Sequence, residues 1–326
     1  MCVTKEDDKM LDFILQALDG IFTIVFVVAI GYVLSKKGWF DDKISSLIAK
    51  LVTNISLPLY MITSLTKNFT FARLTELAPD MLLPVCSMFL AMIIGKITAK
   101  LLRIRRGRSG VFITNFFIAN TMFIGLPVNL ALFGEASIPS VMLYYMVNLI
   151  FFWTLGVQNI VSDIEDRSAC IFSVKVLKKL WSPPLIGFAA AILLIVFNIH
   201  LPGFLIRGFQ YVGNLTTPLS LVFIGIEISK IKLKEFNFER DIWVGLVGRF
   251  LVCPVCVLVL VPFINVAPIS IKVFAMQAAM PAMTQMAIVC KQYGGDSRFA
   301  AALSFITIIG GLVVIPFYMT VVNIYF

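Results

Sequence analysis

The sequence predicts an all-α polytopic membrane protein with ten transmembrane helices in a 5+5 inverted-topology repeat. Three observations predict this fold. First, hydrophobic residues make up 60% of the 326 residues and charged residues 14%, whereas soluble domains contain about 45–50% and about 25%. Second, apolar runs of about 20 residues alternate with short charged loops. Third, features of the first half of the chain recur in the second half at an offset of 160 residues.

Ten apolar stretches are long enough to cross a bilayer. They are residues 14–35, 44–65, 77–98, 109–133, 138–161, 181–199, 204–228, 242–264, 269–292 and 297–323. The longest polar interval, 162–180, divides the chain into a first five-helix repeat, 1–161, and a second, 181–326. We expect this interval to be a cytoplasmic linker.

Basic residues predict the orientation of the spans. The loops that follow odd-numbered spans carry 19 Lys and Arg residues, whereas the opposite side carries six. The cytoplasmic side of a membrane protein has the excess of Lys and Arg. We therefore expect a multi-pass protein of the cell membrane with both termini extracytoplasmic. The same distribution explains the net charge of +9 without a nucleic-acid partner.

The internal repeat pairs two short motifs. Asn54 and Pro58 in the second span correspond to Asn214 and Pro218 in the seventh. Because each repeat holds an odd number of spans, the second copy must cross the membrane in the opposite direction, as in many secondary transporters. Each asparagine precedes its proline by four residues, so its side chain could bond a backbone group that the proline leaves free. We interpret all four residues as structural supports.

The fourth and ninth spans contain helix-breaking residues. Gly125 and Pro127 lie in the fourth, and Pro281 lies in the ninth. Unpaired backbone is tolerated at membrane depth only where it faces protein or a wet cavity. Polar side chains flank both breaks. We expect them to form the substrate-binding site together with Gly125, Pro127 and Pro281, with helix–helix packing of the polar side chains as the alternative. These side chains are Asn120, Thr121, Gln277, Thr284 and Gln285.

Three further residues, Arg249, Cys253 and Cys256, leave more than one interpretation open. Arg249 lies in the eighth span, and we expect it to extend to the lipid headgroups, with a place on an anion pathway as the alternative. Cys253 and Cys256 form a C-x-x-C motif inside an apolar run, which favours packing over redox or metal chemistry. His200 is the single histidine of the sequence, which is too few for a zinc site or a catalytic triad built on histidines. We therefore expect no catalytic residues, no metal site and no cofactor.

Three groups of residues resemble the auxin efflux carrier family, which includes plant carriers and bacterial malate and malonate permeases. The motifs are Asn54…Pro58, Asn120-Thr-Met-Phe-Ile-Gly-Leu-Pro127 and Gln277…Met280-Pro281…Tyr293-Gly-Gly-Asp296. The resemblance implies a scaffold part and a transport part, with the broken fourth and ninth helices crossing in the latter. The chain lacks the long polar central loop of the plant members, so it is more similar to the compact prokaryotic members.

The leading functional prediction is a secondary transporter of small organic anions, such as malate or malonate, that works by alternating access. Its partners would be the anion, the lipid bilayer and a coupling ion, H⁺ or Na⁺, and the sequence leaves a homodimer open. One alternative is a sodium symporter resembling the bile-acid transporters. Another is an auxin-like weak-acid efflux carrier. An enzyme is not expected, because H-E-x-x-H, G-x-S-x-G and a mid-span Asp pair are all missing from the sequence.

Overall fold

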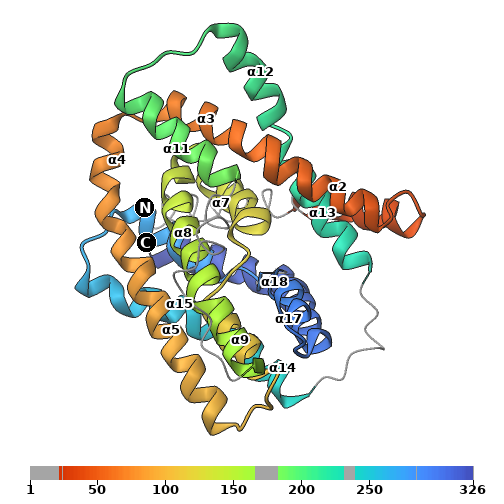
Figure 1. The fold of residues 1–326 in the computed structure, drawn as a ribbon. Helices are drawn as coiled ribbons and strands as arrows, with labels where there is room; N and C mark the ends of the chain where they lie inside the picture. The colour runs from red at the N-terminus through yellow and green to blue at the C-terminus, as the bar shows by residue number, and fades with distance from the viewer. Residues whose placement is uncertain (1–21, 24, 166–182, 231–238, 284, 326) are drawn as a thin grey trace, which may run out of the picture.

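The computed structural model describes residues 22–23, 25–165, 183–230, 239–283 and 285–325 (Figure 1). Within these ranges the chain is helical, and the strand-like pairing is limited to an isolated bridge between Ala119 and Ala282. The all-helical membrane fold is therefore confirmed. Among the described residues, five helices are long and apolar enough to cross a membrane: Lys43–Lys67, Phe71–Leu101, Glu135–Ile164, Gly203–Ser229 and Arg240–Phe263.

Each of these five long helices contains two α-helical segments joined by a turn of different pitch or by a bend. The pairs are α2 (Asp42–Leu51) with α3 (Leu57–Asn68), α4 (Phe71–Leu77) with α5 (Leu82–Leu101), α8 (Ile138–Phe151) with α9 (Val157–Glu165), α12 (Gly203–Gly213) with α13 (Thr216–Ser229), and α14 (Arg240–Val247) with α15 (Cys253–Leu260). The other helices are Val25–Lys36, α6 (Ser109–Asn115), α7 (Leu126–Phe133), α11 (Pro183–Val196), α16 (Pro268–Ala278), α17 (Gln285–Gln292) and α18 (Ser297–Tyr325). Each predicted span range overlaps at least one described helix.

A π-helical turn precedes Pro58 and occupies Val52–Ser56. Proline has no N–H for the carbonyl four residues earlier, and a wider turn changes the pairing locally. The Asn54 side chain is exposed, and within the described residues it makes no hydrogen bond to the backbone around Pro58. The π-helical turn of the backbone thus accommodates Pro58, whereas we expected the Asn54 side-chain amide to do so. Asn214 is likewise exposed, at the bend between α12 and α13.

The helices pack in two groups (Figure 1). We call helix Val25–Lys36 with α2, α3, α11, α12 and α13 the α3 group, because α11 and α12 both pack along α3. We call α5 to α9 with α14 to α18 the crossing group. Both groups contain helices from both halves of the chain. They meet where α13 packs against α7, against the π-helical turn before α7 and against α18, and where α3 packs against α8. The rings of Phe123 and Phe223 lie 5.1 Å apart.

Close helix packing holds the α3 group together. A Cβ atom on Gly187 of α11 would lie 2.5 Å from Pro58 Cα, and one on Gly213 of α12 would lie 2.9 Å from the Tyr60 backbone. Small residues let helix backbones approach in membranes, where van der Waals contact drives association. Any larger residue at either position would push α3 away from its neighbours.

Candidate functional site

Two helices are interrupted at the same place in the crossing group. On the fourth predicted span, α6 ends at Asn115 and the next helical turn begins at Thr121. On the ninth, α16 ends at Ala278 and α17 begins at Gln285. The two unwound stretches run antiparallel, and the Asn120 N–H donates to the Pro281 carbonyl over 2.8 Å. Four half-helices therefore end or begin at one point, which we call the crossing.

The break in the fourth span lies earlier than its glycine and proline suggested. The unwound residues are 116–120, whereas Gly125 and Pro127 lie within helical turns. Pro127 is in the first turn of α7, a position where a missing N–H costs little. Helix-breaking residues therefore marked the correct span, but the place of the break within it was wrong.

Side chains from neighbouring helices pair the backbone groups that the breaks leave free. Asn148 of α8 is fully buried, accepts from the Ala119 N–H at 2.9 Å and donates to the Ala119 carbonyl at 3.1 Å. Thr307 of α18 accepts from the Ala282 N–H at 3.0 Å. Asn148 thus pairs the backbone of the unwound stretch. The sequence did not indicate this role of Thr307, because the hydroxyl of a threonine within a helix commonly bonds a carbonyl of its own helix. Thr307 also does so, at the Ser304 carbonyl.

Four of the predicted site residues form one cluster across the crossing. Gln277 is fully buried, and its Nε2 donates to the Thr121 carbonyl at 3.3 Å. A Cβ atom on Gly125 would lie 2.0 Å from Gln277 Oε1, so only glycine leaves room for this amide. Asn120 directly precedes the π-helical turn Thr121–Gly125, and its Oδ1 accepts from the Phe123 N–H at 3.2 Å.

The remaining predicted residues are placed less completely. Pro281 supplies the carbonyl that Asn120 bonds. Gln285 is the first residue of α17, but its side chain lies outside the described part of the structure. Thr284 lies outside the described residues altogether.

Arg249 does not extend to the headgroups. Its side chain is 0% exposed, and its guanidinium donates to the carbonyls of Asn115, Ile118 and Ala278. The expectation of an interfacial position was therefore wrong. Depth along the helix did not determine the direction of the side chain, because three unpaired carbonyls lie within its reach on the inner side. Cys253, one turn further along, donates its thiol to the Phe116 carbonyl.

An ion-pair cluster joins helix ends at the side of the crossing group that carries the basic loops. Arg108, just before α6, bonds Asp296 at 2.6 Å and also pairs with Glu239. The Asp296 N–H in turn donates to the Gly107 carbonyl. Burial raises the pKa of Asp296, but hydrogen bonds from the Phe299 N–H and from Arg108 outweigh it and hold the pKa below its ordinary value. The cluster fixes the ends of α6 and α18 to each other.

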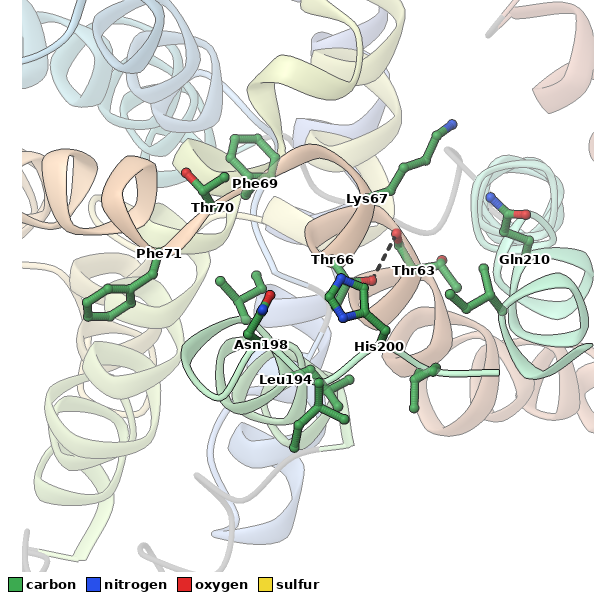
Figure 2. A pocket seen from close by; sticks show the side chains of 14 residues that line it. Thr63, Thr66, Lys67, Phe69, Thr70, Phe71, Leu194, Asn198, His200 and Gln210 are labelled. Atoms are coloured by element: carbon green, nitrogen blue, oxygen red, sulfur yellow. Dashed lines mark hydrogen bonds between the residues drawn. The ribbon is translucent and has the colours of Figure 1, made fainter. Parts of the chain in front are cut away.

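A separate pocket of about 500 Å³ lies between α3, α11 and α12, away from the crossing (Figure 2). Its lining includes Lys67, Asn198, His200 and Gln210. The Thr63 and Thr66 hydroxyls in its wall donate to carbonyls of their own helix. None of the predicted site residues lines this pocket, so it supplies a control location for tests of the crossing.

Comparison with known proteins identifies the chain. A family model described as membrane transport protein matches residues 17–319. The chain belongs to this membrane transport protein family. Two curated relatives cover nearly all of it. An uncharacterized transporter of Methanocaldococcus jannaschii is 23% identical over 302 residues, covering 91% of this chain and 96% of its own length. An uncharacterized transporter of Methanothermobacter thermautotrophicus is 23% identical over 310 residues, covering 93% and 97%.

The family membership confirms the resemblance to the auxin efflux carrier family that the sequence motifs indicated. The protein is a multi-pass membrane transporter of this family, whose members typically do not act as enzymes.

Proposed function

We propose that this transporter moves small organic anions, such as malate, malonate or other mono- and dicarboxylates, across the cell membrane by alternating access. The observation that carries the proposal is the crossing itself, where the Asn120 N–H bonds the Pro281 carbonyl. This bond brings the first turns of two half-helices together. A helix N-terminus carries free N–H groups and about half a positive charge, which favours an anion.

The proposal includes the topology predicted from the sequence. Ten spans form two inverted five-helix repeats, 1–161 and 181–326, with a cytoplasmic linker between them and both termini extracytoplasmic. In this arrangement α6 and α16 approach the crossing from opposite membrane faces, and α7 and α17 leave it toward opposite faces. The N-termini of α7 and α17 then converge near the midplane, the usual depth of a substrate site in such transporters.

Asn120 would contribute directly to anion binding. Its Oδ1 is occupied by the Phe123 N–H, so its amide N–H₂ group is available as a donor. Thr121 would add a hydroxyl, and Thr284 and Gln285 would line the opposite side. Gln277 would act by holding the two breaks together, since its Nε2 bonds the Thr121 carbonyl.

Alternating access would use the contact between the two helix groups. The crossing group meets the α3 group at α13, beside the π-helical turn Thr121–Gly125 that begins the α7 half-helix. A shift of one group along the other would therefore carry the site past α13. Contacts of this kind between packed helices permit sliding motions between two states.

The test is uptake of radiolabelled malate, malonate, acetate and indole-3-acetate by proteoliposomes that contain the full-length protein. Asn120→Ser keeps an oxygen acceptor for the helix start but removes the amide donor, and Asn120→Asp adds a negative charge at the same place. Losing one hydrogen bond to a charged ligand costs about 1.5–3 kcal/mol, or roughly 10- to 150-fold in affinity. We expect the affinity for the anion to fall by at least that factor in Asn120→Asp, because the added negative charge repels the anion. Gln210→Ala, in the separate pocket, is the control and should transport normally. Equal uptake by all three variants would refute the site.

A further inference from the structure

The guanidinium of Arg249 joins the two half-helices that end at the crossing. Its Nη1 donates to the carbonyls of Asn115 at 3.0 Å and Ile118 at 2.8 Å, and its Nη2 donates to the carbonyl of Ala278. Asn115 and Ala278 are the last residues of α6 and α16. Within the described residues no acidic side chain pairs with Arg249. Its partners are these carbonyls and the Tyr144 hydroxyl.

These carbonyls carry negative charge that needs a partner. The last carbonyls of a helix have no bond within it, and each C-terminus carries about half a negative charge. Two such ends together carry about one negative charge, and the guanidinium carries one positive charge. In other broken-helix transporters, unwound carbonyls and half-helix C-termini coordinate Na⁺. Arg249 meets the same chemical requirement with a side chain.

A second donor from the same helix bonds a carbonyl that lies between those of Asn115 and Ile118 in the sequence. Cys253 is one turn beyond Arg249, and its thiol donates to the carbonyls of Phe116 and Gly248. At the end of α6 and in the unwound stretch after it, the carbonyls of Asn115, Phe116 and Ile118 are therefore all bonded to side chains of one helix. A metal ion would have to displace both donors to bind these oxygens.

We infer that Arg249 is a built-in cation that replaces Na⁺ at the crossing, so that this transporter binds its anion without sodium. The inference rests on the proposed function and specifies its coupling. With both C-terminal ends neutralised by Arg249, the N-termini of α7 and α17 are the helix ends left for the substrate. Arg249 would thus be a positioning residue that need not touch the anion.

The first test measures Tm for the purified full-length protein in equal concentrations of NaCl, KCl and choline chloride. The wild type should have the same Tm in all three salts. Arg249→Met leaves three carbonyls unpaired and should lower Tm by roughly 5–15 °C. It should also become more stable in NaCl than in choline chloride, because its carbonyls are free to bind a metal ion. Arg240→Met is the matched control, since Arg240 is on the same helix but exposed. It bonds one carbonyl, that of Leu102, and pairs with the neighbouring Asp241 at 3.7 Å.

The second test measures malate uptake by wild-type proteoliposomes in the same three salts, where equal rates are expected. Higher wild-type Tm or uptake in NaCl would overturn the inference. So would an Arg249→Met variant that is as stable as Arg240→Met, or one with equal Tm in NaCl and choline chloride. If Arg249→Met does not fold, Arg249→Lys, which keeps the charge, should fold with a Tm independent of Na⁺. Failure of the wild type to take up any carboxylate would refute the proposed function, while the Tm comparison would still judge Arg249.

Discussion

Asn148→Leu provides the sharpest test of how the crossing is held together. Leucine has the same number of side-chain heavy atoms as asparagine, branched at the same carbon, so the substitution removes polar atoms without opening a large cavity. It deletes both hydrogen bonds to Ala119, at 2.9 and 3.1 Å, in a position that is fully buried. The Ala119 N–H and carbonyl would then lack partners at membrane depth.

Two magnitudes compete in this prediction. Polar contacts between membrane helices are worth about 0.6 kcal/mol on average, which would make the loss of two bonds about 1 kcal/mol. A buried backbone group that is left unpaired costs about 1–3 kcal/mol, which makes the loss about 2–6 kcal/mol. We expect the larger value, because the bridge with Ala282 directs both Ala119 groups away from the paired stretch. For a chain of 326 residues, the corresponding fall in Tm is roughly 3–9 °C.

The assay is thermal unfolding of the purified protein in detergent, followed by intrinsic fluorescence. The matched control is Asn159→Leu in α9, because the Asn159 Nδ2 is buried and has no partner within the described residues. Removing that amide should change Tm little or raise it. If Asn148→Leu and Asn159→Leu unfold at the same temperature, Asn148 does not support the break, and our account of the crossing is wrong.

Three further predictions follow from specific contacts. Gly125→Ala would place a methyl group 2.0 Å from Gln277 Oε1 and should lower Tm by several degrees, and Gln277→Ala in the same protein should restore it; failure to restore it would contradict the contact. The pKa of Asp296 is lower in the folded than in the unfolded protein, so its ionised form contributes stability at neutral pH that is lost as pH falls through the folded pKa. Asp296→Asn should therefore lower Tm at about pH 7 and flatten the decline of Tm between about pH 5 and 3, and an unchanged decline would contradict this. A single cysteine in the loop Arg103–Arg108 of a protein with its native cysteines replaced should react with an impermeant maleimide only after the cells are opened, and labelling of intact cells would reverse the proposed orientation.

Local properties of the sequence were sufficient to predict an all-helical membrane protein and to identify the two spans that are interrupted. A membrane span is recognised from a run of consecutive apolar residues, and the predicted runs overlap the described helices. Proline acts on its own helix, so Pro127 and Pro281 identified the two interrupted spans. The Asn-Thr and Gly-Leu-Pro motif identified the family. The place of the break at residues 116–120 could not be read locally, because Pro127 lies in a helical turn and the unwound stretch is held by other helices.

The partners of each buried polar group were decided by tertiary structure alone. Arg249 bonds carbonyls 134, 131 and 29 positions away, and Asn148 bonds a residue 29 positions away. A hydropathy pattern gives the depth of such a side chain but not the oxygen that it reaches. The cost of an unpaired polar group in an apolar interior makes each of these contacts necessary, while the sequence shows only that a polar residue is present. For Arg249 this difference separates a headgroup anchor from a cation that joins two helix ends.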